Sequence, residues 1–415
     1  MTRTGPQGRT QPPQTDPIRA LLASPPDLPV VEVLPELRER LSPGPSASDD
    51  AGACLVLTAP PGTGKTTLVP PVLAGVLADV AASTPQHTPQ RTPEHRPGRV
   101  VVTQPRRIAA RAAARRLADL LGEEVGGTVG YAVRGERRAG PDTRIEVVTA
   151  GLLLRRLQRD PELSGVDAVI LDEVHERSLD SDLLLALLAH ARAALREDLT
   201  LGARSATLDA DRLRRILGGS SGDPAPLVEV PGRLHPLEEV WAPPGRTGRL
   251  GPDGVPREFL AHVAATVERA LAERSGDVLV FLPGEREIRE TTEHLLRAVA
   301  RGGAGRGQGG RSRADLPLAS GEIVPPYARL PAADQQRVFN PGNAPRIVLA
   351  TNVAETSLTV PGIRYVIDPG LARISRYSNR TKVQRLPIEP VSRASADQRS
   401  GRCGRVADGI AIRLY

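Results

Sequence analysis

Residues 54–67 read CLVLTAPPGTGKTT, and this stretch decides the fold of the first part of the chain. The apolar run 54–58 predicts a buried strand, and a helix-forming run follows from Leu68. Between them lie a glycine-rich loop and the tripeptide Gly64-Lys65-Thr66. A strand, such a loop and a helix form a phosphate-binding loop, in which backbone N–H groups at the helix N-terminus surround phosphate oxygens.

The lysine of this loop stands out because the chain has 55 basic residues, of which only Lys65 and Lys382 are lysine. The slim ammonium of lysine can reach the β- and γ-phosphates of a nucleotide, whereas the planar fork of arginine does not fit there. The alternative is a chance Gly-Lys-Thr turn. The predicted nucleotide-binding residues of the loop are Gly62, Thr63, Gly64, Lys65, Thr66 and Thr67.

Length and composition narrow the class of protein. At 415 residues the chain is long enough for two or three domains. No apolar stretch approaches membrane-spanning length, and the first 16 residues lack the apolar core of a signal peptide, so we predict a cytoplasmic protein without a membrane partner. Two cysteines exclude a disulfide framework. The net charge of +7 favours a polyanionic partner, and the 2% aromatic content favours backbone contacts over base stacking.

Three polar segments interrupt the chain: residues 1–16, the Pro/Thr-rich residues 81–98 and the Gly/Arg-rich residues 301–314. Their compositions bury too little apolar surface to fold, so we predict a disordered N-terminus, a disordered insertion and a solvated loop. The alternative for the Gly/Arg-rich segment is weak binding to RNA. One helix is predicted near the N-terminus, from Val31 to Leu41.

Short apolar runs alternate with helical runs along the rest of the chain, which predicts an α/β fold with mainly parallel sheets covered on both faces. A break at Pro231-Gly232-Arg233 divides them into two tandem domains, residues 17–231 and 232–415. The predicted strands are Arg99–Gln104, Ile145–Thr149, Ala168–Asp172, Thr200–Ala206, Asp277–Leu282, Arg346–Thr351, Arg364–Ile367 and Gly409–Leu414.

Residues 169–177, VILDEVHER, place two carboxylates directly after an apolar strand. Open α/β sheets bind ligands at the carboxyl ends of their strands. Asp172 is predicted to hold Mg²⁺ through water together with Thr66, and Glu173 to orient the attacking water beside the metal. The predicted metal-site residues are therefore Thr66, Asp172 and Glu173. For this stretch taken alone, an acidic helix N-terminus is an equal alternative.

Asp172-Glu173-Val174-His175 resembles the DEAH box of superfamily 2 helicases, and further motifs of that family follow in its order from about residue 50 to the last residue. The resemblance implies two RecA-like P-loop NTPase domains and adds His175 to the catalytic residues. The other motifs are TQPRR at 103–107, TAGLLLR at 149–155, SAT at 205–207, FLPGE at 281–285, ATNVAETSLT at 350–359 and QRSGRCGR at 398–405.

The resemblance also implies ATP as the substrate and a set of roles around it. It implies two arginine fingers that stabilise the transferred phosphoryl group, a glutamine that positions water, two residues that sandwich the base, and a serine that contacts the nucleotide. In that order they are Arg402 and Arg405, Gln398, Arg116 and Phe339, and Ser357. The fingers and Lys65 lie in different domains, so hydrolysis would require a closed cleft.

A nucleic-acid face is implied in the same way. Its partners would be single-stranded RNA or an RNA duplex with a 3′ tail, and ribosomal or mRNA complexes. The motor would move along the single strand in the 3′ to 5′ direction. Lys382 lies in residues 373–390, where the family carries a hairpin beside the RNA channel; an ordinary solvated hairpin is the alternative. The predicted contacts are Arg106, Arg107, Thr149, Arg155, Gly284, Thr351 and Lys382.

The chain departs from the family pattern at several positions. Ala59 replaces the first glycine of the phosphate loop, so its φ should be negative or slightly strained. Val174 replaces an alanine, and we expect this replacement to have no effect on the site. Cys403 should be a small packing residue, the alternative being a low-pKa thiol between arginines. The first domain is most similar to the bacterial HrpB branch and the second to the HrpA branch. The chain is then either a natural intermediate between the two branches or a fusion of them.

The resemblance predicts the two-domain motor of a bacterial DEAH-box RNA helicase that hydrolyses ATP with Mg²⁺. The chain ends at Tyr415, before the C-terminal domains that close the RNA channel in this family, so it could be a fragment whose missing domains are supplied elsewhere. One alternative is an ATPase switch that remodels ribonucleoproteins without unwinding. Another is a P-loop ATPase with a protein or transport task. Strand displacement and RNA-dependent ATP turnover would separate the three.

Overall fold

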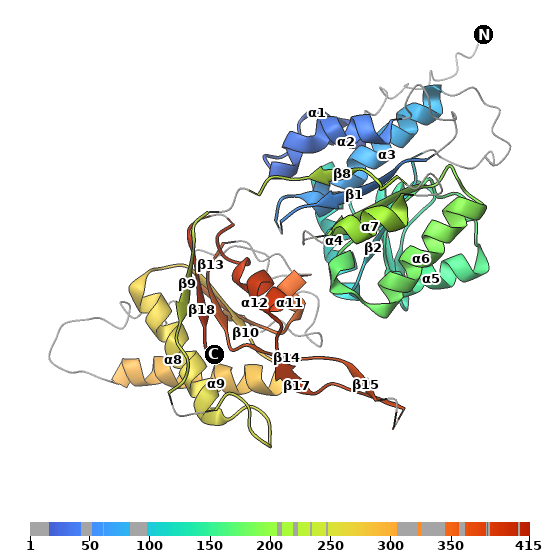
Figure 1. Ribbon diagram of the computed structural model, residues 1–415. Helices are drawn as coiled ribbons and strands as arrows, with labels where there is room; N and C mark the ends of the chain where they lie inside the picture. The colour runs from blue at the N-terminus through green and yellow to red at the C-terminus, as the bar shows by residue number, and fades with distance from the viewer. Residues whose placement is uncertain are drawn as a thin grey trace, which may run out of the picture. The chain divides into compact units, whose positions relative to one another are not determined.

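The computed structural model of the chain divides into two units, Met1–Gly232 and Arg233–Tyr415 (Figure 1). This division lies at the break that the sequence shows at residues 231–233. The residues described are 16–42, 52–60, 62–83, 98–205, 210–218, 223–232, 235–245, 248–304, 322–324, 345–356, 362–378, 380, 382–405 and 407–415.

The first unit is built on one sheet, in which eight strands lie within the described residues in the order β4-β3-β5-β2-β6-β7-β1-β8. All neighbours are parallel except the pair β3 and β4. The strands, in sheet order, are Glu136–Arg138, Val129–Val133, Ile145–Thr149, Val100–Gln104, Ala168–Leu171, Thr200–Ser205, Cys54–Thr58 and Leu227–Glu229.

Helices cover both faces of this sheet (Figure 1). Because side chains alternate along a strand, β1 sends Leu55 and Leu57 to one apolar cluster and Val56 to the other. The first cluster packs on α1, η1, α2, α3 and α4, which span Pro17–Ala23, Pro29–Val33, Leu34–Leu41, Lys65–Ser83 and Arg107–Leu121. The second packs on α5, α6 and α7, which span Ala150–Arg159, Leu179–Ala194 and Ala210–Leu217.

One of these helices corrects an expectation from the sequence. Among the described helices, α3 is long and apolar enough to cross a membrane by length and composition, with a mean hydropathy of 1.5. It is nevertheless a core helix, because Leu68, Val72 and Leu73 are buried in the cluster shared with α1, α2 and α4. Its first residue is the phosphate-loop lysine, Lys65.

The second unit contains a parallel sheet with the order β11-β12-β10-β13-β18-β9 among its described strands. Its apolar core lies between this sheet and the helices α8, Arg257–Glu273, and α9, Glu285–Ala304. Two shorter helices, α11 and α12, span Val353–Thr356 and Arg393–Ser400. The strands, in sheet order, are Glu322–Val324, Arg346–Ala350, Asp277–Phe281, Ile363–Asp368, Gly409–Arg413 and Leu237–Trp241.

Two small antiparallel pairs extend from this unit. Strands β14, Leu371–Arg373, and β17, Ile388–Pro390, form the inner pair. Strands β15, Arg376–Ser378, and β16, Val383–Arg385, form the outer pair (Figure 1). The structure therefore has a hairpin within residues 373–390, the position that the resemblance implied.

The predicted strands are all present, within two residues at either end. The sequence did not predict the five-residue strands β3, which is buried, and β9, nor the three-residue strands such as β4 and β8, which are partly exposed. The predicted helix 31–41 was wrong at its start, since Pro35 fits only a first helical turn and α2 begins at Leu34. The helix after the phosphate loop begins three residues before Leu68, because Gly64 accepts hydrogen bonds from Thr67 and Leu68.

The polar segments are shorter than predicted where the structure describes them. Residues 81–83 belong to α3, and residues 301–304 belong to α9. Asp16, predicted as part of the disordered start, caps α1 by accepting a hydrogen bond from the Ile18 amide at 3.0 Å. Residues 1–15, 84–97 and 305–314 lie outside the described residues.

Candidate nucleotide site and nucleic-acid face

The phosphate loop runs from β1 to α3 and requires glycine at two positions. Gly62 has a φ of 87° and Gly64 a φ of 89°, a region that residues with a Cβ rarely adopt. A Cβ on Gly64 would lie 2.7 Å from Cδ1 of Leu28. The N-terminal segment therefore packs directly on the loop, and the Val30 amide donates to the Thr63 carbonyl at 3.0 Å. Ala59 is not among the described residues with positive φ, as predicted.

Lys65 lies at the N-terminus of α3, and only 5% of it is exposed. Its Nζ donates to the Ala59 carbonyl at 3.3 Å and lies 3.9 Å from Oε1 of Glu173. The ammonium is thus held under the loop by one backbone oxygen and one carboxylate. Both partners are ones that a phosphate group could replace.

Asp172 follows β6 directly, and its side chain is fully buried. Its Oδ2 accepts hydrogen bonds from Thr66 Oγ1 at 3.2 Å and from Gln104 Nε2 at 2.6 Å. The same oxygen lies 2.8 Å from Nη2 of Arg204. The carboxylate thus joins α3, β2 and β7 at the carboxyl edge of the sheet. The sequence predicted the pairing with Thr66 but not the other two.

Glu173 lies beside this carboxylate in a left-handed conformation, with a φ of 54°. Its amide donates to Asp172 Oδ1 at 3.0 Å, which fixes the turn after β6. Its Oε2 lies 3.3 Å from Nε2 of His175, and both side chains are largely buried. One carboxylate oxygen of Glu173 therefore faces Lys65 and the other faces His175.

Arg204 is a buried residue of this group that the sequence motifs did not indicate. It lies on β7, its side chain is 1% exposed, and its Nη1 donates to the Lys65 carbonyl. Burial lowers its pKa, while the charges of Asp172 and Glu173 oppose this shift. Its position in the sequence offered one clue, an arginine inside the buried strand TLGARS, where a charge requires a specific partner.

The donor types around Asp172 suit a magnesium ion. Mg²⁺ prefers hard oxygen ligands and keeps several waters, so one hydroxyl and one carboxylate from the protein are enough. Thr66 Oγ1 and Asp172 Oδ2 supply these, 3.2 Å apart. Among the described residues there is no cluster of three His, Cys, Asp or Glu side chains that could hold a metal by itself. Waters and phosphate oxygens would supply the remaining ligands of the metal.

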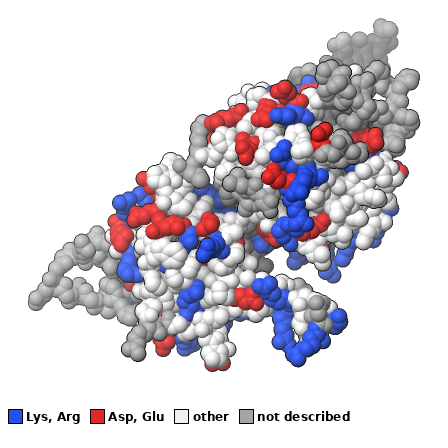
Figure 2. Space-filling model, viewed as in Figure 1, with Lys and Arg blue, Asp and Glu red and all other residues white. Residues whose placement is uncertain are grey.

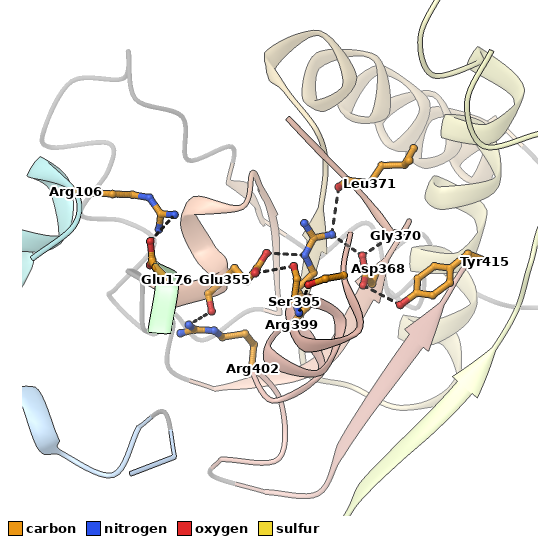
Figure 3. Close-up of polar contacts among 11 residues, drawn as sticks. Arg106, Glu176, Glu355, Asp368, Gly370, Leu371, Ser395, Arg399, Arg402 and Tyr415 are labelled. Carbon is orange, nitrogen blue, oxygen red and sulfur yellow. Dashed lines mark hydrogen bonds and ion pairs between the residues drawn. The ribbon is translucent and has the colours of Figure 1, made fainter. Parts of the chain in front are cut away.

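The second unit has its own buried arginine, Arg399 on α12 (Figure 3). Its Nε donates to Glu355 Oε2 at 3.0 Å, and its Nη1 donates to Asp368 Oδ1 at 2.7 Å and to the Leu371 carbonyl at 3.2 Å. Its guanidinium also lies 4.8 Å above the ring of Phe281. Arg399 thereby ties α12 to α11 and to the end of β13.

The predicted phosphate-acting residues lie on and just after α12. Arg402 is buried, and its Nη2 donates to the carbonyl of Glu355 (Figure 3). The Nε of Arg405 donates to the Gly401 carbonyl at 2.9 Å, and Gln398 is partly exposed. Cys403 is 1% exposed, and burial raises the pKa of its thiol to about 12. It is a packing residue, as predicted, and not a reactive thiol.

The predicted RNA contacts of the first unit follow β2 and β5, which are neighbours in the sheet. Arg106 precedes α4, and its Nη2 lies 3.3 Å from Glu176 Oε2 (Figure 3). Arg107 and Arg155 are exposed on α4 and α5, and Thr149 directly precedes α5. These residues share the carboxyl edge with the phosphate loop, and β6, which precedes Asp172, and β7 lie between the two groups.

In the second unit, Gly284 and Thr351 follow the neighbouring strands β10 and β12. A Cβ on Gly284 would lie 2.7 Å from Nε of Arg373, so the glycine lets the base of the hairpin approach. Lys382 is exposed on the outer hairpin, with a φ of 54°. Figure 2 shows basic side chains gathered along this hairpin; the exposed ones are Arg373, Arg376, Arg380, Lys382 and Arg385.

The residues predicted to hold the base and the nucleotide are only partly described. Arg116 is exposed on α4. Phe339 and Ser357 lie outside the described residues. Their roles stay predictions.

Two family descriptions match the chain at the places that this geometry marks. The DEAD/DEAH box helicase family matches residues 46–216. The helicase conserved C-terminal domain matches residues 261–407. The first match contains the phosphate loop and Asp172, and the second contains Glu355, Arg399 and Arg402.

Proteins named as helicases are similar over much of the chain. ATP-dependent RNA helicase HrpA of Escherichia coli K12 is 47% identical over 313 residues, 75% of this chain and 22% of HrpA. ATP-dependent RNA helicase HrpB of the same strain is 41% identical over 389 residues, 93% of this chain and 41% of HrpB. The crystal structure of E. coli DEAH/RHA helicase HrpB is 39% identical with a TM-score of 0.72, covering 94% of this chain and 42% of that one. The chain therefore spans less than half the length of these relatives.

Proposed function

Because the chain belongs to the DEAD/DEAH box helicases, with HrpA and HrpB among its relatives, we propose that it is the motor of an ATP-dependent RNA helicase. The observation that supports this most strongly is the group formed by Lys65, Thr66, Asp172 and Glu173 at the carboxyl edge of the first sheet. Phosphoryl transfer needs a phosphate cradle, a metal and an oriented water, and this group offers a residue for each.

Each residue of the group has a proposed task. Lys65 would leave Glu173 and the Ala59 carbonyl to contact the β- and γ-phosphates, while the loop amides bind phosphate oxygens. Thr66 and Asp172 would hold Mg²⁺, which offsets charge on the phosphates when bound. Glu173 would then orient the attacking water, with His175 3.3 Å from its other oxygen.

The catalytic role of the second unit is proposed from its motif and its charge. Arg402 and Arg405 are proposed to stabilise the transferred phosphoryl group, and Gln398 to position the water. Arg116 and Phe339 are proposed to stack on the base, and Ser357 to contact the nucleotide. Stacking reads no base edge, so nucleotide choice would be loose.

RNA is the proposed polyanionic partner. Arg107, Arg155 and the arginines of the hairpin are exposed, and Arg106 is half-buried beside Glu176; all would contact phosphates rather than bases. We propose single-stranded RNA, or a duplex with a 3′ tail, as the substrate, and ribosomal or mRNA complexes in the cytoplasm as its setting. The low aromatic content of the chain is consistent with backbone contacts.

The test is steady-state ATP turnover by the full chain at low salt, with and without single-stranded RNA. We expect Mg²⁺-dependent turnover that RNA stimulates, and its loss in Glu173→Gln. Displacement of a duplex with a 3′ tail separates an unwinding motor from an RNA-stimulated switch that remodels ribonucleoproteins. Turnover that RNA leaves unchanged would instead support a P-loop ATPase with another task.

A further inference from the structure

Arg204 places a fully buried positive charge in the nucleotide site, on the carboxylate that faces the predicted metal. Its guanidinium lies 2.8 Å from Asp172 Oδ2, the same oxygen that accepts from Thr66. Its other nitrogen, Nη1, donates to the carbonyl of Lys65. A guanidinium stays protonated in a protein, so this charge is permanent.

The charge of Arg204 balances the net charge of the side chains around the phosphate loop. Lys65 pairs with Glu173 at 3.9 Å, and Arg204 pairs with Asp172, so the four charges cancel. Without Arg204 the same group would carry one excess negative charge. A negative site attracts a divalent cation and repels a nucleotide polyphosphate.

Arg204 should therefore lower the affinity of the site for a divalent cation and raise its affinity for a nucleotide. We propose that Arg204 is a positioning residue that neutralises Asp172, so that the site takes up the divalent cation together with the nucleotide rather than alone. The inference rests on the proposed function, because it takes Asp172 as the carboxylate that faces Mg²⁺. It adds a residue outside the motifs that carry the resemblance, and it predicts the order in which ligands bind.

The test measures two affinities on the nucleotide site without any turnover. Binding of Mn²⁺ alone is followed by electron paramagnetic resonance of the free ion. Binding of ADP in the presence of EDTA is followed by calorimetry. In Arg204→Met we expect Mn²⁺ to bind at least tenfold tighter and metal-free ADP at least tenfold weaker than in the parent chain.

Arg196→Met is the matched control. Arg196 is also a largely buried arginine of the first unit, and it pairs with Asp198 at 2.7 Å away from the phosphate loop. Neither affinity should change in this variant. Arg204→Lys keeps the charge, so it should restore the affinity for metal-free ADP at least in part. A merely structural role for Arg204 would give no such rescue.

The proposal requires that the Mn²⁺ affinity and the ADP affinity change in opposite directions in Arg204→Met. Weakening of both ligands, or no change in either, would overturn the proposal. If Arg204→Met does not fold, Asp172→Asn carries the test: Arg204 is then uncompensated, and metal-free ADP should bind at least tenfold tighter than in the parent. Unchanged ADP affinity in Asp172→Asn would also overturn it. Absence of ATP turnover in the parent chain would count against the proposed function, whereas these affinities test Arg204 on their own.

Discussion

Each unit buries an arginine at the end of a parallel sheet, and the two arginines have different surroundings. Arg204 and Arg399 are both about 1% exposed, and each pairs with a carboxylate at the end of a central strand, Asp172 or Asp368. Each also reaches a second segment of the predicted catalytic machinery. Arg204 binds the carbonyl of Lys65, and Arg399 binds the side chain of Glu355.

The difference lies in how fully each charge is compensated. Arg399 has two carboxylates, a carbonyl and the face of Phe281 around it. Within the part of the chain that the structure describes, Arg204 contacts one carboxylate and one carbonyl, and burial lowers its pKa. Removal of either arginine would leave a buried carboxylate without its partner. With more partners, Arg399 is expected to contribute mainly to the stability of the second unit, whereas Arg204 is proposed to act on ligand binding.

The largest expected effect on ATP turnover comes from Arg402, which lies three residues after Arg399. Arg402→Ala should lower ATP turnover by about 10³-fold to 10⁵-fold, because an arginine finger stabilises charge that appears only in the transition state. ATP binding should change much less. Single-turnover hydrolysis and equilibrium nucleotide binding measure the two quantities. A turnover close to that of the parent would show that Arg402 only supports α12.

The next effect concerns the carboxylate of the first unit. Glu173→Gln should lower turnover by about 10²-fold to 10⁴-fold, because the amide keeps the shape of the side chain but cannot act as a base. ATP should bind and persist in this variant. Lys65→Ala is the contrasting variant, since it removes a phosphate contact and should weaken ATP binding. Parental turnover in Glu173→Gln would contradict the role proposed for this residue.

Substitution of Arg399 by methionine tests its contribution to stability. It leaves Asp368 and Glu355 without their cation and should lower the free energy of unfolding of the second unit by about 3–5 kcal/mol. The chain has one cysteine in each unit, Cys54 and Cys403, so thiol labelling in a denaturant series reports on each unit separately. Labelling of Cys403 should shift to lower denaturant, and labelling of Cys54 should not.

These cysteines also predict a pH dependence. The pKa of Cys403 is raised to about 12, so the neutral thiol is favoured below that pH and the reactive thiolate forms only as the pH rises towards it. At pH 8 the thiolate fraction of the native thiol is about 10⁻⁴, and alkylation should be correspondingly slow. Rapid alkylation of Cys403 in the native chain at pH 8 would mean that α12 opens readily.

The smallest expected effect is on nucleotide choice. Purine and pyrimidine triphosphates should be hydrolysed within about tenfold of one another, because stacking makes no hydrogen bond to a base edge. Values of kcat/KM for ATP, GTP, CTP and UTP measure this. A strict preference for ATP would show that a residue beyond Arg116 and Phe339 reads the base.

Much of the fold followed from local pattern, because buried parallel strands are continuous apolar runs and the phosphate loop is contiguous in sequence. The pairing of Thr66 with Asp172 also followed, since both positions belong to recognisable motifs. The environment of Arg204 did not, because it depends on β7 lying between β6 and β1 in the sheet order. Packing of Leu28 on Gly64 was missed for the same reason, as it joins segments that share no motif.

The scarcity of lysine has a consequence for limited proteolysis. Lys65 is buried at the start of α3, whereas Lys382 is exposed on the outer hairpin. A lysine-specific endoproteinase should therefore cut the native chain once, after Lys382, and reach Lys65 only after the first unit unfolds. The rate of that single cut becomes a direct reporter of the hairpin. Bound RNA should slow it if the hairpin contacts RNA, and an unchanged rate would favour an ordinary solvated hairpin.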